Sequence, residues 1–209
     1  MSKKKAALII LAVIILVGAI AAHFYQPAAA KLSPTKYTIP ARNDYSFGTS
    51  SPRLTIVEFS DFACPFCQES YPALRELGLK YKNSVQIIFK DFPIHADSLY
   101  LALAARCAGE QGLFWPMHDK LFAMQGQFAT TSLPDLAVSV GADKTKFSAC
   151  LTGQKYLTDI RADYADGQTL DSNGNPLVSG TPTFFFNGYK AVGEIPKDKF
   201  EEIIRQFLK

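Results

Sequence analysis

The hydrophobic positions along the chain form three patterns: an uninterrupted apolar stretch, short strand-like runs and longer stretches with helical spacing. Residues 6–25 contain no Lys, Arg, Asp or Glu and are mainly Leu, Ile, Val and Ala. Further on, short apolar runs rich in β-branched and aromatic residues, 53–60 and 84–90, flank a helical pattern over 65–80. Short runs of this kind are typical of buried strands. Their order predicts two parallel strands joined by a right-handed crossover helix.

The middle of the chain, about 95–170, has the pattern of a helical insert. Residues 97–110 are rich in Ala and Leu, and Leu99, Leu103 and Cys107 repeat at the spacing of one helix face. Gly and Pro residues separate the helical stretches that follow. These stretches are expected at about 113–125, 133–140, 143–152 and 154–170.

The strand pattern returns near the end of the chain, at residues 183–186 and 189–192. Asn187-Gly188 separates the two runs, and Asn-Gly between apolar runs is the strongest short-range signal of a β-hairpin. A final helix is expected over 197–208, where apolar residues recur on one stripe. The chain therefore ends with a hairpin and an amphipathic helix.

The element order places the folded domain, of α/β class, at residues 52–209. Residues 26–51 are rich in Pro and polar residues and are interpreted as a linker, with a short strand near Tyr37 to Ile39. The chain of 209 residues is long enough for one such domain with a sizeable core and a preceding targeting segment.

Residues 1–25 are interpreted as that targeting segment. Lys3, Lys4 and Lys5 precede the apolar stretch, and about 20 helical residues span a bilayer's hydrocarbon core of roughly 30 Å. An uncleaved signal anchor is favoured over a cleaved signal peptide, for which residues 28–30, all Ala, offer a cleavage site. The lysines place the N-terminus in the cytoplasm and the domain on the periplasmic or extracellular side.

The charge argues against nucleic-acid binding. The formal net charge is +3, and the three lysines of the targeting segment account for all of it. The folded part is therefore neutral overall, whereas a nucleic-acid binder shows a basic face.

Cys64-Pro65-Phe66-Cys67 is the sharpest chemical signal. Its strand–turn–helix setting places Cys64 at a helix N-terminus, where free N–H groups and the helix dipole stabilise a thiolate. Such sites lower the cysteine pKa to about 3.5–7.5. We expect Cys64 to be the exposed nucleophile and Cys67 to be the buried resolving thiol. Pro65 suits the first turn of the helix, because its missing N–H costs nothing there.

Two other interpretations of the CxxC spacing stay open. The pair is either a structural disulfide or half of a zinc site. Zinc requires further ligands at metal spacing, and the sequence has no second CxxC and no close pair of histidines. No metal and no bound cofactor is therefore expected.

Three separated segments, in this order, resemble the DsbA-like branch of the thioredoxin superfamily. They are Glu58 to Cys67, the Cys107 to Trp115 segment, and Gly180 to Gly188. The resemblance covers roughly residues 52–208 and is to the shorter bacterial members. It implies a thioredoxin fold with an inserted helical subdomain, preceded by the membrane segment.

The resemblance also implies roles for individual residues. Pro182 corresponds to the cis-proline that faces the redox pair, and the backbone of Thr181 is then available to pair with an extended substrate. Pro65 and Phe66 are expected on the substrate-binding surface. The alternative for Pro182 is a trans proline that begins a strand.

Glu58 matches the family's buried acidic residue beneath the redox pair. A buried carboxyl has a raised pKa and is able to exchange a proton with Cys67. The alternative is a solvated glutamate at the end of a strand. Phe66 departs from the family pattern, because the best-studied oxidants have His there. The imidazolium that stabilises their thiolate is absent, so the strength of the oxidant stays open.

Cys107 and Cys150 lie in the predicted insert. In an oxidising compartment they are expected to form a disulfide, and shorter family members have a similar second pair. Two separate buried thiols and a regulatory redox pair are the alternatives.

The remaining candidates are weaker. His23 lies in the membrane segment. His95 follows the second predicted strand; one interpretation places it near the active site, but a loop histidine usually has no catalytic role. His118 is interpreted as a packed or capping residue. Phe184 to Phe186 is interpreted as core strand rather than a ligand site.

The leading functional hypothesis is a monomeric enzyme that introduces disulfides into exported proteins. The resemblance implies reduced or unfolded exported proteins as substrates and a quinone-linked, DsbB-like membrane protein that reoxidises the enzyme. One alternative is a reductase or isomerase on the same fold, which a lower reduction potential would reveal. Another is a peptide-binding or chaperone module without turnover, against which the intact CxxC pair argues.

Overall fold

The structure is a computed structural model that describes residues 32–40, 42, 44–127 and 132–209. The predicted membrane segment, residues 1–25, and the cleavage site at 28–30 lie outside these ranges. Within them, no helix combines the length and the apolar composition that a membrane span requires.

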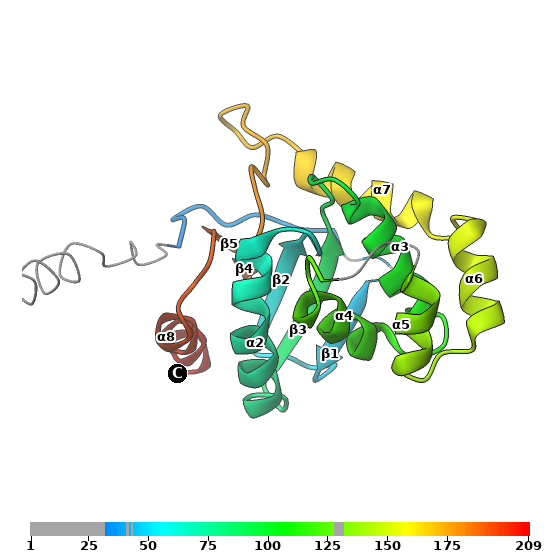
Figure 1. Cartoon of the computed structure of the whole chain (residues 1–209). Helices are drawn as coiled ribbons and strands as arrows, with labels where there is room; N and C mark the ends of the chain where they lie inside the picture. The colour runs from blue at the N-terminus through cyan, green and yellow to red at the C-terminus, as the bar shows by residue number, and fades with distance from the viewer. Residues whose placement is uncertain (1–31, 41, 43, 128–131) are drawn as a thin grey trace, which may run out of the picture.

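Five strands form one mixed sheet in the order β1-β3-β2-β4-β5 (Figure 1). At its centre, β2 (Leu54–Ser60) and β3 (Val85–Asp91) run parallel, as the strand–helix–strand pattern predicted. β4 (Thr183–Phe186) pairs antiparallel with β2, and β5 (Tyr189–Val192) pairs antiparallel with β4. Asn187 and Gly188 connect β4 and β5 with positive φ angles of 48° and 93°, the backbone conformation that an Asn-Gly hairpin turn uses.

β1 (Tyr45–Gly48) corrects the sequence analysis, which interpreted residues 26–51 as a linker. It pairs antiparallel with β3, and its Tyr45 ring stacks on Phe114 with centroids 3.9 Å apart. Near the strand expected at 37–39, the structure has an isolated β-bridge at Lys36 instead. Four residues are too short for a recognisable alternation, so packing against β3 and the insert decides this strand.

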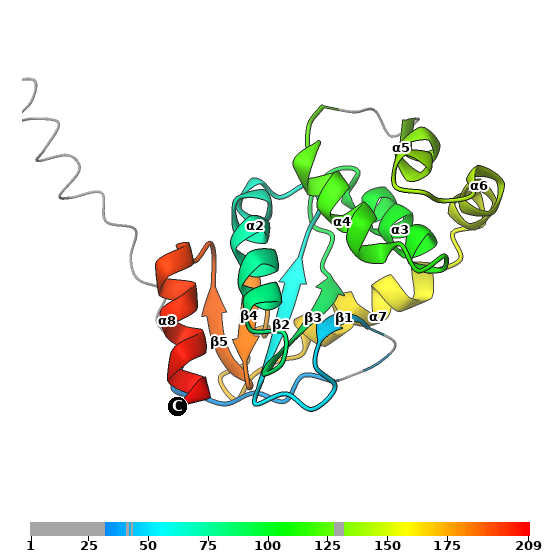
Figure 2. The ribbon, with the colours of Figure 1, turned by 90° about the horizontal axis from the view of Figure 1, so that it is seen from below.

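Helices cover both faces of the sheet (Figure 2). α2 (Pro65–Lys80) and α8 (Lys197–Leu208) pack side by side on one face. α7 (Leu157–Gln168) packs on β3 from the other face, where Tyr164 stacks on Phe92. The region of α7 was expected to belong to the insert, but α7 packs on β3 and covers this face of the sheet.

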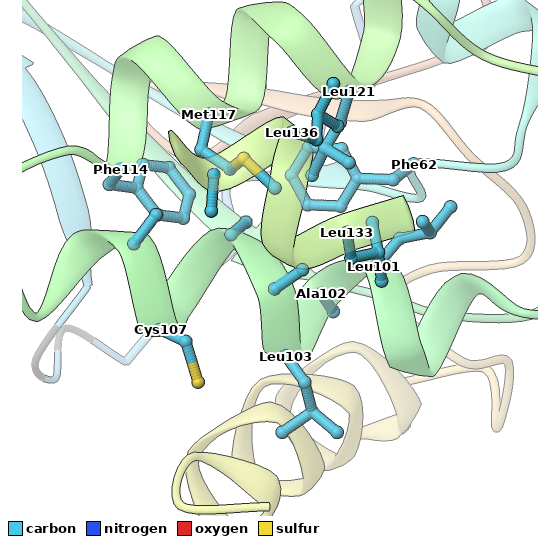
Figure 3. Close-up of a cluster of buried hydrophobic side chains, with 14 of the residues drawn as sticks. Phe62, Leu101, Ala102, Leu103, Cys107, Phe114, Met117, Leu121, Leu133 and Leu136 are labelled. Atoms are coloured by element: carbon cyan, nitrogen blue, oxygen red, sulfur yellow. The ribbon is translucent and has the colours of Figure 1, made fainter. Parts of the chain in front are cut away.

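The other helices of the described residues, α3 to α6, form the insert and share a hydrophobic core that also takes in Phe62, Cys67 and Phe89 (Figure 3). Leu103, Phe114, Met117 and Leu121 are fully or almost fully buried in that core. The bounds are α3 Ser98–Gly109, α4 Phe114–Ala123, α5 Leu133–Ser139 and α6 Lys144–Thr152.

A disulfide joins Cys107 in α3 to Cys150 in α6, with Cα atoms 5.7 Å apart. This is the pairing expected from the sequence. Both residues are buried, so the bond lies inside the insert and away from the solvent.

Phe62 connects the insert to the sheet. It comes two residues before Cys64 and lies in the core of the insert, close to Leu121 and Leu136 (Figure 3). Its ring centroid is 4.9 Å from that of Phe122 in α4 and 5.3 Å from that of Phe89 in β3. The segment that leads into the CxxC motif is therefore packed between the sheet and the insert.

Candidate active site

The CxxC motif lies where β2 leads into α2. Cys64 is the residue that precedes the helix, with extended φ and ψ angles of −80° and 122°, and Pro65 occupies the first turn. The N–H of Cys64 donates to the carbonyl oxygen of Asp61 at 3.0 Å, which closes the turn between strand and helix. Cys67 follows in the first turn of α2, so both sulfurs belong to the helix N-terminus. Both cysteines are thiols in this structure.

The prediction that Cys64 is exposed is wrong. Only 2% of the residue is accessible, and Cys67 is completely buried. The Cys64 Sγ is buried and, while it is protonated, donates to the carbonyl oxygen of Thr181 at 3.3 Å. Phe66, by contrast, is 56% exposed, and it is the apolar residue that the motif presents to solvent.

The two thiols have opposite acidities. The pKa of Cys64 is lowered from its ordinary value of 9.0 to about 5. A hydrogen bond from Cys67 is the main cause, and Thr181 and the backbone N–H groups of Cys67 and Phe66 add to it against the opposing effect of burial. The pKa of Cys67 is raised by burial first, then by Cys64 and by the nearby charge of Glu58. At neutral pH the pair is therefore one thiolate and one thiol.

Glu58 lies in β2 and is completely buried, which excludes the solvated alternative. Neither of its carboxylate oxygens has a hydrogen-bond partner among the described residues. Burial without a counter-charge disfavours the ionised form and raises the pKa of Glu58 to about 7. Because its charge raises the pKa of Cys67, the carboxyl is within electrostatic reach of that thiol.

Thr181 and Pro182 lie across from the redox pair, on the loop that enters β4. The bond between them is cis, so the trans alternative does not apply. Thr181 accepts the Cys64 hydrogen bond with its backbone and is largely buried. Its hydroxyl oxygen has no partner within the part of the chain that the structure describes. The redox pair, Glu58 and this loop thus lie at the same end of the sheet.

A family model described as Thioredoxin matches residues 41–206. The chain belongs to the thioredoxin family. The matched range begins before residue 52 and includes β1, in agreement with the observed sheet.

Curated relatives of this thioredoxin-family protein include Na⁺/H⁺ antiporters named NhaA. The protein from Salinispora arenicola is 37% identical over 153 residues, and that from Salinispora tropica is 36% identical over 153 residues. In each case the match covers 72% of this chain but only 22% of the antiporter. The chain thus corresponds to a small part of these relatives.

Solved structures share the fold. BdbD from Bacillus subtilis has 22% identity and a TM-score of 0.70, with 86% of this chain and 98% of BdbD covered. A thioredoxin-like oxidoreductase from Silicibacter pomeroyi has 24% identity and a TM-score of 0.69, with coverage of 79% and 92%. The thiol-disulfide exchange protein alpha-DsbA2 from Wolbachia pipientis has 19% identity and a TM-score of 0.65, with coverage of 77% and 85%. The fold is therefore that of the DsbA-like proteins.

Asp61 is a buried site residue that the sequence analysis missed. Its carboxylate accepts hydrogen bonds from the N–H groups of Ala63, Ile94 and His95, and it lies 2.9 Å from the His95 ring nitrogen Nδ1. It thereby ties the turn before Cys64 to the loop after β3. The Asp-x-Ala turn is a local signal that points to this residue, because Asp commonly accepts from the N–H two residues later.

Gln125, just beyond α4, is a second residue that the sequence analysis missed. Its side-chain amide donates to the carbonyl oxygens of Phe62 at 2.8 Å and of Cys64 at 3.1 Å. No local sequence pattern indicates this contact, because it joins segments about sixty residues apart.

The other candidates lie outside the redox chemistry. His118 is completely buried among aromatic rings, with Nδ1 2.8 Å from Asp119, and burial lowers its pKa. Phe184 to Phe186 are fully buried core residues. Among the described residues, no group of three or more His, Cys, Asp or Glu side chains is arranged to hold a metal ion.

Proposed function

We propose that this protein is a thiol–disulfide oxidoreductase that introduces disulfides into proteins outside the cytoplasm. The observation that carries the proposal is that Cys64 and Cys67 lie at one helix N-terminus, against the cis Thr181-Pro182 loop, and the acidities of the two thiols support it. Cys64 has a pKa of about 5, and Cys67 stays a thiol. Because the two pKa values differ so much, Cys64 is the sulfur that reacts with substrate, and Cys67 is the sulfur that stays buried.

The proposed reaction begins with the oxidised enzyme. A substrate thiolate attacks the Cys64 sulfur, the Cys64–Cys67 bond breaks, and Cys67 leaves with the electron pair. The Glu58 carboxyl, with its pKa of about 7, supplies the proton that Cys67 needs in its buried position. A second substrate thiolate then attacks the substrate sulfur of the mixed disulfide and releases Cys64 as a thiolate. The substrate loses two electrons, and the enzyme gains them.

The direction of electron flow follows from the reduced state. A disulfide has no thiolate to stabilise, so every interaction that lowers the pKa of Cys64 favours the reduced enzyme over the oxidised one. An enzyme that prefers its reduced form is an oxidant. We therefore expect a reduction potential nearer to about −120 mV than to about −270 mV, even with Phe66 between the cysteines.

Substrate binding is assigned to the surface around the motif. An extended peptide is proposed to pair with the backbone beside Thr181, next to the Cys64 sulfur. Pro65 and Phe66 are exposed and offer apolar contact to the same peptide. The contact is not sequence-specific, which suits an enzyme that acts on many unfolded proteins.

The proposed location is the periplasmic or extracellular face of a membrane. Residues 1–25 support an anchor there, with the soluble form after cleavage as the alternative. The antiporters that match this chain are membrane transporters by name, which fits a domain that works at a membrane surface. A quinone-linked, DsbB-like protein is the proposed reoxidising partner, and the enzyme is proposed to act as a monomer without a bound cofactor.

The test is oxidation of a reduced, unfolded protein that contains two cysteines. Oxidised wild-type protein is expected to form one substrate disulfide for each Cys64–Cys67 disulfide that it loses. The Cys64→Ser variant is expected to be inactive. Cys67→Ser is tested with a substrate in its disulfide form: the Cys64 thiolate attacks that disulfide, one substrate sulfur leaves as a thiolate, and the mixed disulfide at Cys64 is expected to accumulate. A non-catalytic peptide-binding module does not form it. Failure of the wild-type protein to oxidise the substrate would overturn the proposal.

A further inference from the structure

The end of α4 is hydrogen-bonded to the turn that carries the nucleophilic cysteine. Gln125 donates from its side-chain nitrogen to two carbonyl oxygens of that turn, those of Phe62 at 2.8 Å and of Cys64 at 3.1 Å. Both ends of the three-residue turn are therefore held by one side chain. That side chain belongs to the helical insert, whereas the turn belongs to the sheet and α2.

A second glutamine, in α2, donates in the other direction, from α2 to the insert. Gln68 in α2 donates from its side chain to the carbonyl oxygen of Phe122 in α4 at 2.8 Å. Its backbone N–H donates to the carbonyl oxygen of Cys64 at 3.1 Å, as the first turn of α2 requires. The Cys64 carbonyl oxygen thus receives one donor from α2 and one from the insert.

The orientation of this carbonyl affects the thiolate. Cys64 stands at the start of α2, and no side chain caps the helix at that position. The N–H groups of Phe66 and Cys67 reach the Cys64 sulfur in this structure, in which the Cys64 backbone is extended. A donor that holds the Cys64 carbonyl therefore also holds the sulfur in line with those N–H groups.

We propose that Gln125 is a positioning residue for the redox pair, through which the helical insert sets the reactivity of Cys64. The proposal rests on the proposed thiol–disulfide chemistry and extends it, because it gives the insert a part in that chemistry. Gln125 does not touch the reacting sulfur and acts through the backbone of Cys64.

Packing between the insert and α2 does not depend on this contact alone. The Tyr71 and Phe122 rings stack with centroids 5.2 Å apart, and Phe62 packs on Phe122 as well. Loss of the Gln125 donor is therefore expected to loosen the turn and to leave the fold intact.

The experiment compares Gln125→Glu with Gln127→Glu. The first change keeps the shape of the side chain but removes the N–H donor and directs an acceptor at two carbonyls. Gln127 is exposed and only two residues away, so its variant adds the same charge without touching the turn. Gln125→Ala removes the donor without adding charge. The readouts are the pKa of Cys64, from the ultraviolet absorbance of the thiolate in reduced protein, and the reduction potential.

We expect Gln125→Glu to raise the pKa of Cys64 by about one unit beyond Gln127→Glu, with Gln125→Ala changed in the same direction. The equilibrium with a reference dithiol is expected to shift about tenfold toward oxidised enzyme, which corresponds to about 30 mV. Equal pKa values in the Gln125→Glu and Gln127→Glu proteins would overturn the proposal. So would an unchanged pKa in Gln125→Ala, which decides the matter if Gln125→Glu does not fold.

The test of Gln125 is independent of the test of the proposed function. The pKa of Cys64 is measurable whether or not the wild-type protein oxidises a substrate. A wild-type protein that oxidises no substrate would contradict the proposed oxidase function. An active wild-type protein whose Gln125 variants have an unchanged Cys64 pKa would contradict only the proposed role of Gln125.

Discussion

Two buried polar regions of the sheet are built in opposite ways. One is the redox centre at the end of β2, where the carboxylate of Glu58 has no hydrogen-bond partner among the described residues. The other joins β3 to α3 and α7, and we call it the charged cluster. Its members are the buried residues Lys90, Asp91, Arg106, Asp163 and Asp166, together with the partly buried Asp44.

Opposite charges meet directly in the charged cluster. The Lys90 ammonium lies 3.0 Å from Asp44, 3.0 Å from Asp163 and 3.3 Å from Asp166. Arg106 pairs with Asp91 and Asp163. Among the described residues no cation contributes to the pKa of Glu58, and burial instead raises that pKa to about 7. The comparison indicates that the paired charges of the charged cluster fix how α3 and α7 pack on β3. The unpaired carboxyl of Glu58 instead has a raised pKa, which allows it to exchange a proton.

Removing a cation from the charged cluster should have the largest effect on stability. Lys90→Met leaves three buried carboxylates with less compensation, and we expect a loss of about 3–5 kcal/mol in the free energy of unfolding. Urea denaturation measures it. Lys80→Met is the control, because Lys80 pairs with Glu201 at the solvent-exposed surface and the loss of that pair should change the stability little. A Lys90 variant as stable as the control would contradict the structural role of the cluster.

The disulfide of the insert should behave like the charged cluster and unlike the redox pair. It closes a loop with a sequence separation of 43, and the chain-entropy model gives about 4 kcal/mol for that length. The double variant Cys107→Ala, Cys150→Ala is expected to lose about that much stability and to keep its activity per folded molecule. Lost activity with unchanged stability would show instead that this pair takes part in redox chemistry.

Glu58 should make stability depend on pH in a defined direction. Its pKa is about 7 in the folded protein against an ordinary value of 4.5, so the folded state binds the proton more tightly. The stability from this group is present below about pH 4.5 and is lost as the pH rises through 7, in total about 3 kcal/mol. Denaturation of wild type and Glu58→Gln across this range measures the contribution. Parallel curves of stability against pH for the two proteins would show that the pKa of Glu58 is not raised in the folded protein.

The hydroxyl of Thr181 should affect the redox centre by the smallest amount. The hydroxyl oxygen is buried and has no partner among the described residues while Cys64 is a thiol, so it is available to donate once Cys64 ionises, and Thr181 contributes to the lowered pKa of that thiol. Thr181→Val keeps the shape and removes the donor, so we expect the pKa of Cys64 to rise by up to about one unit with little change in stability. The thiolate absorbance of the reduced variant checks this. An unchanged pKa would show that the Cys67 thiol and the backbone N–H groups lower the pKa of Cys64 without the Thr181 hydroxyl.

Local patterns predicted the parts of the molecule that depend on neighbours in sequence. A few neighbouring residues determine the turn and helix start at Cys64 to Cys67, the central strands and the Asn187-Gly188 turn. The structure has the predicted secondary structure at each of these places. The charged cluster was not predicted, because Lys90 and Asp163 are far apart in the chain and meet only through the packing of α7. The burial of Cys64 was missed for the same reason, since Thr181 approaches it from a distant loop.

The reduction potential of the Cys64–Cys67 pair tests the central claim most directly. The claim is that a stabilised Cys64 thiolate beside a buried, unpaired Glu58 makes this thioredoxin-family protein an oxidant. Equilibration of the full chain with a reference dithiol of known potential gives the value. We predict a potential nearer to about −120 mV, and a value near −270 mV, typical of a reductant, would contradict the account.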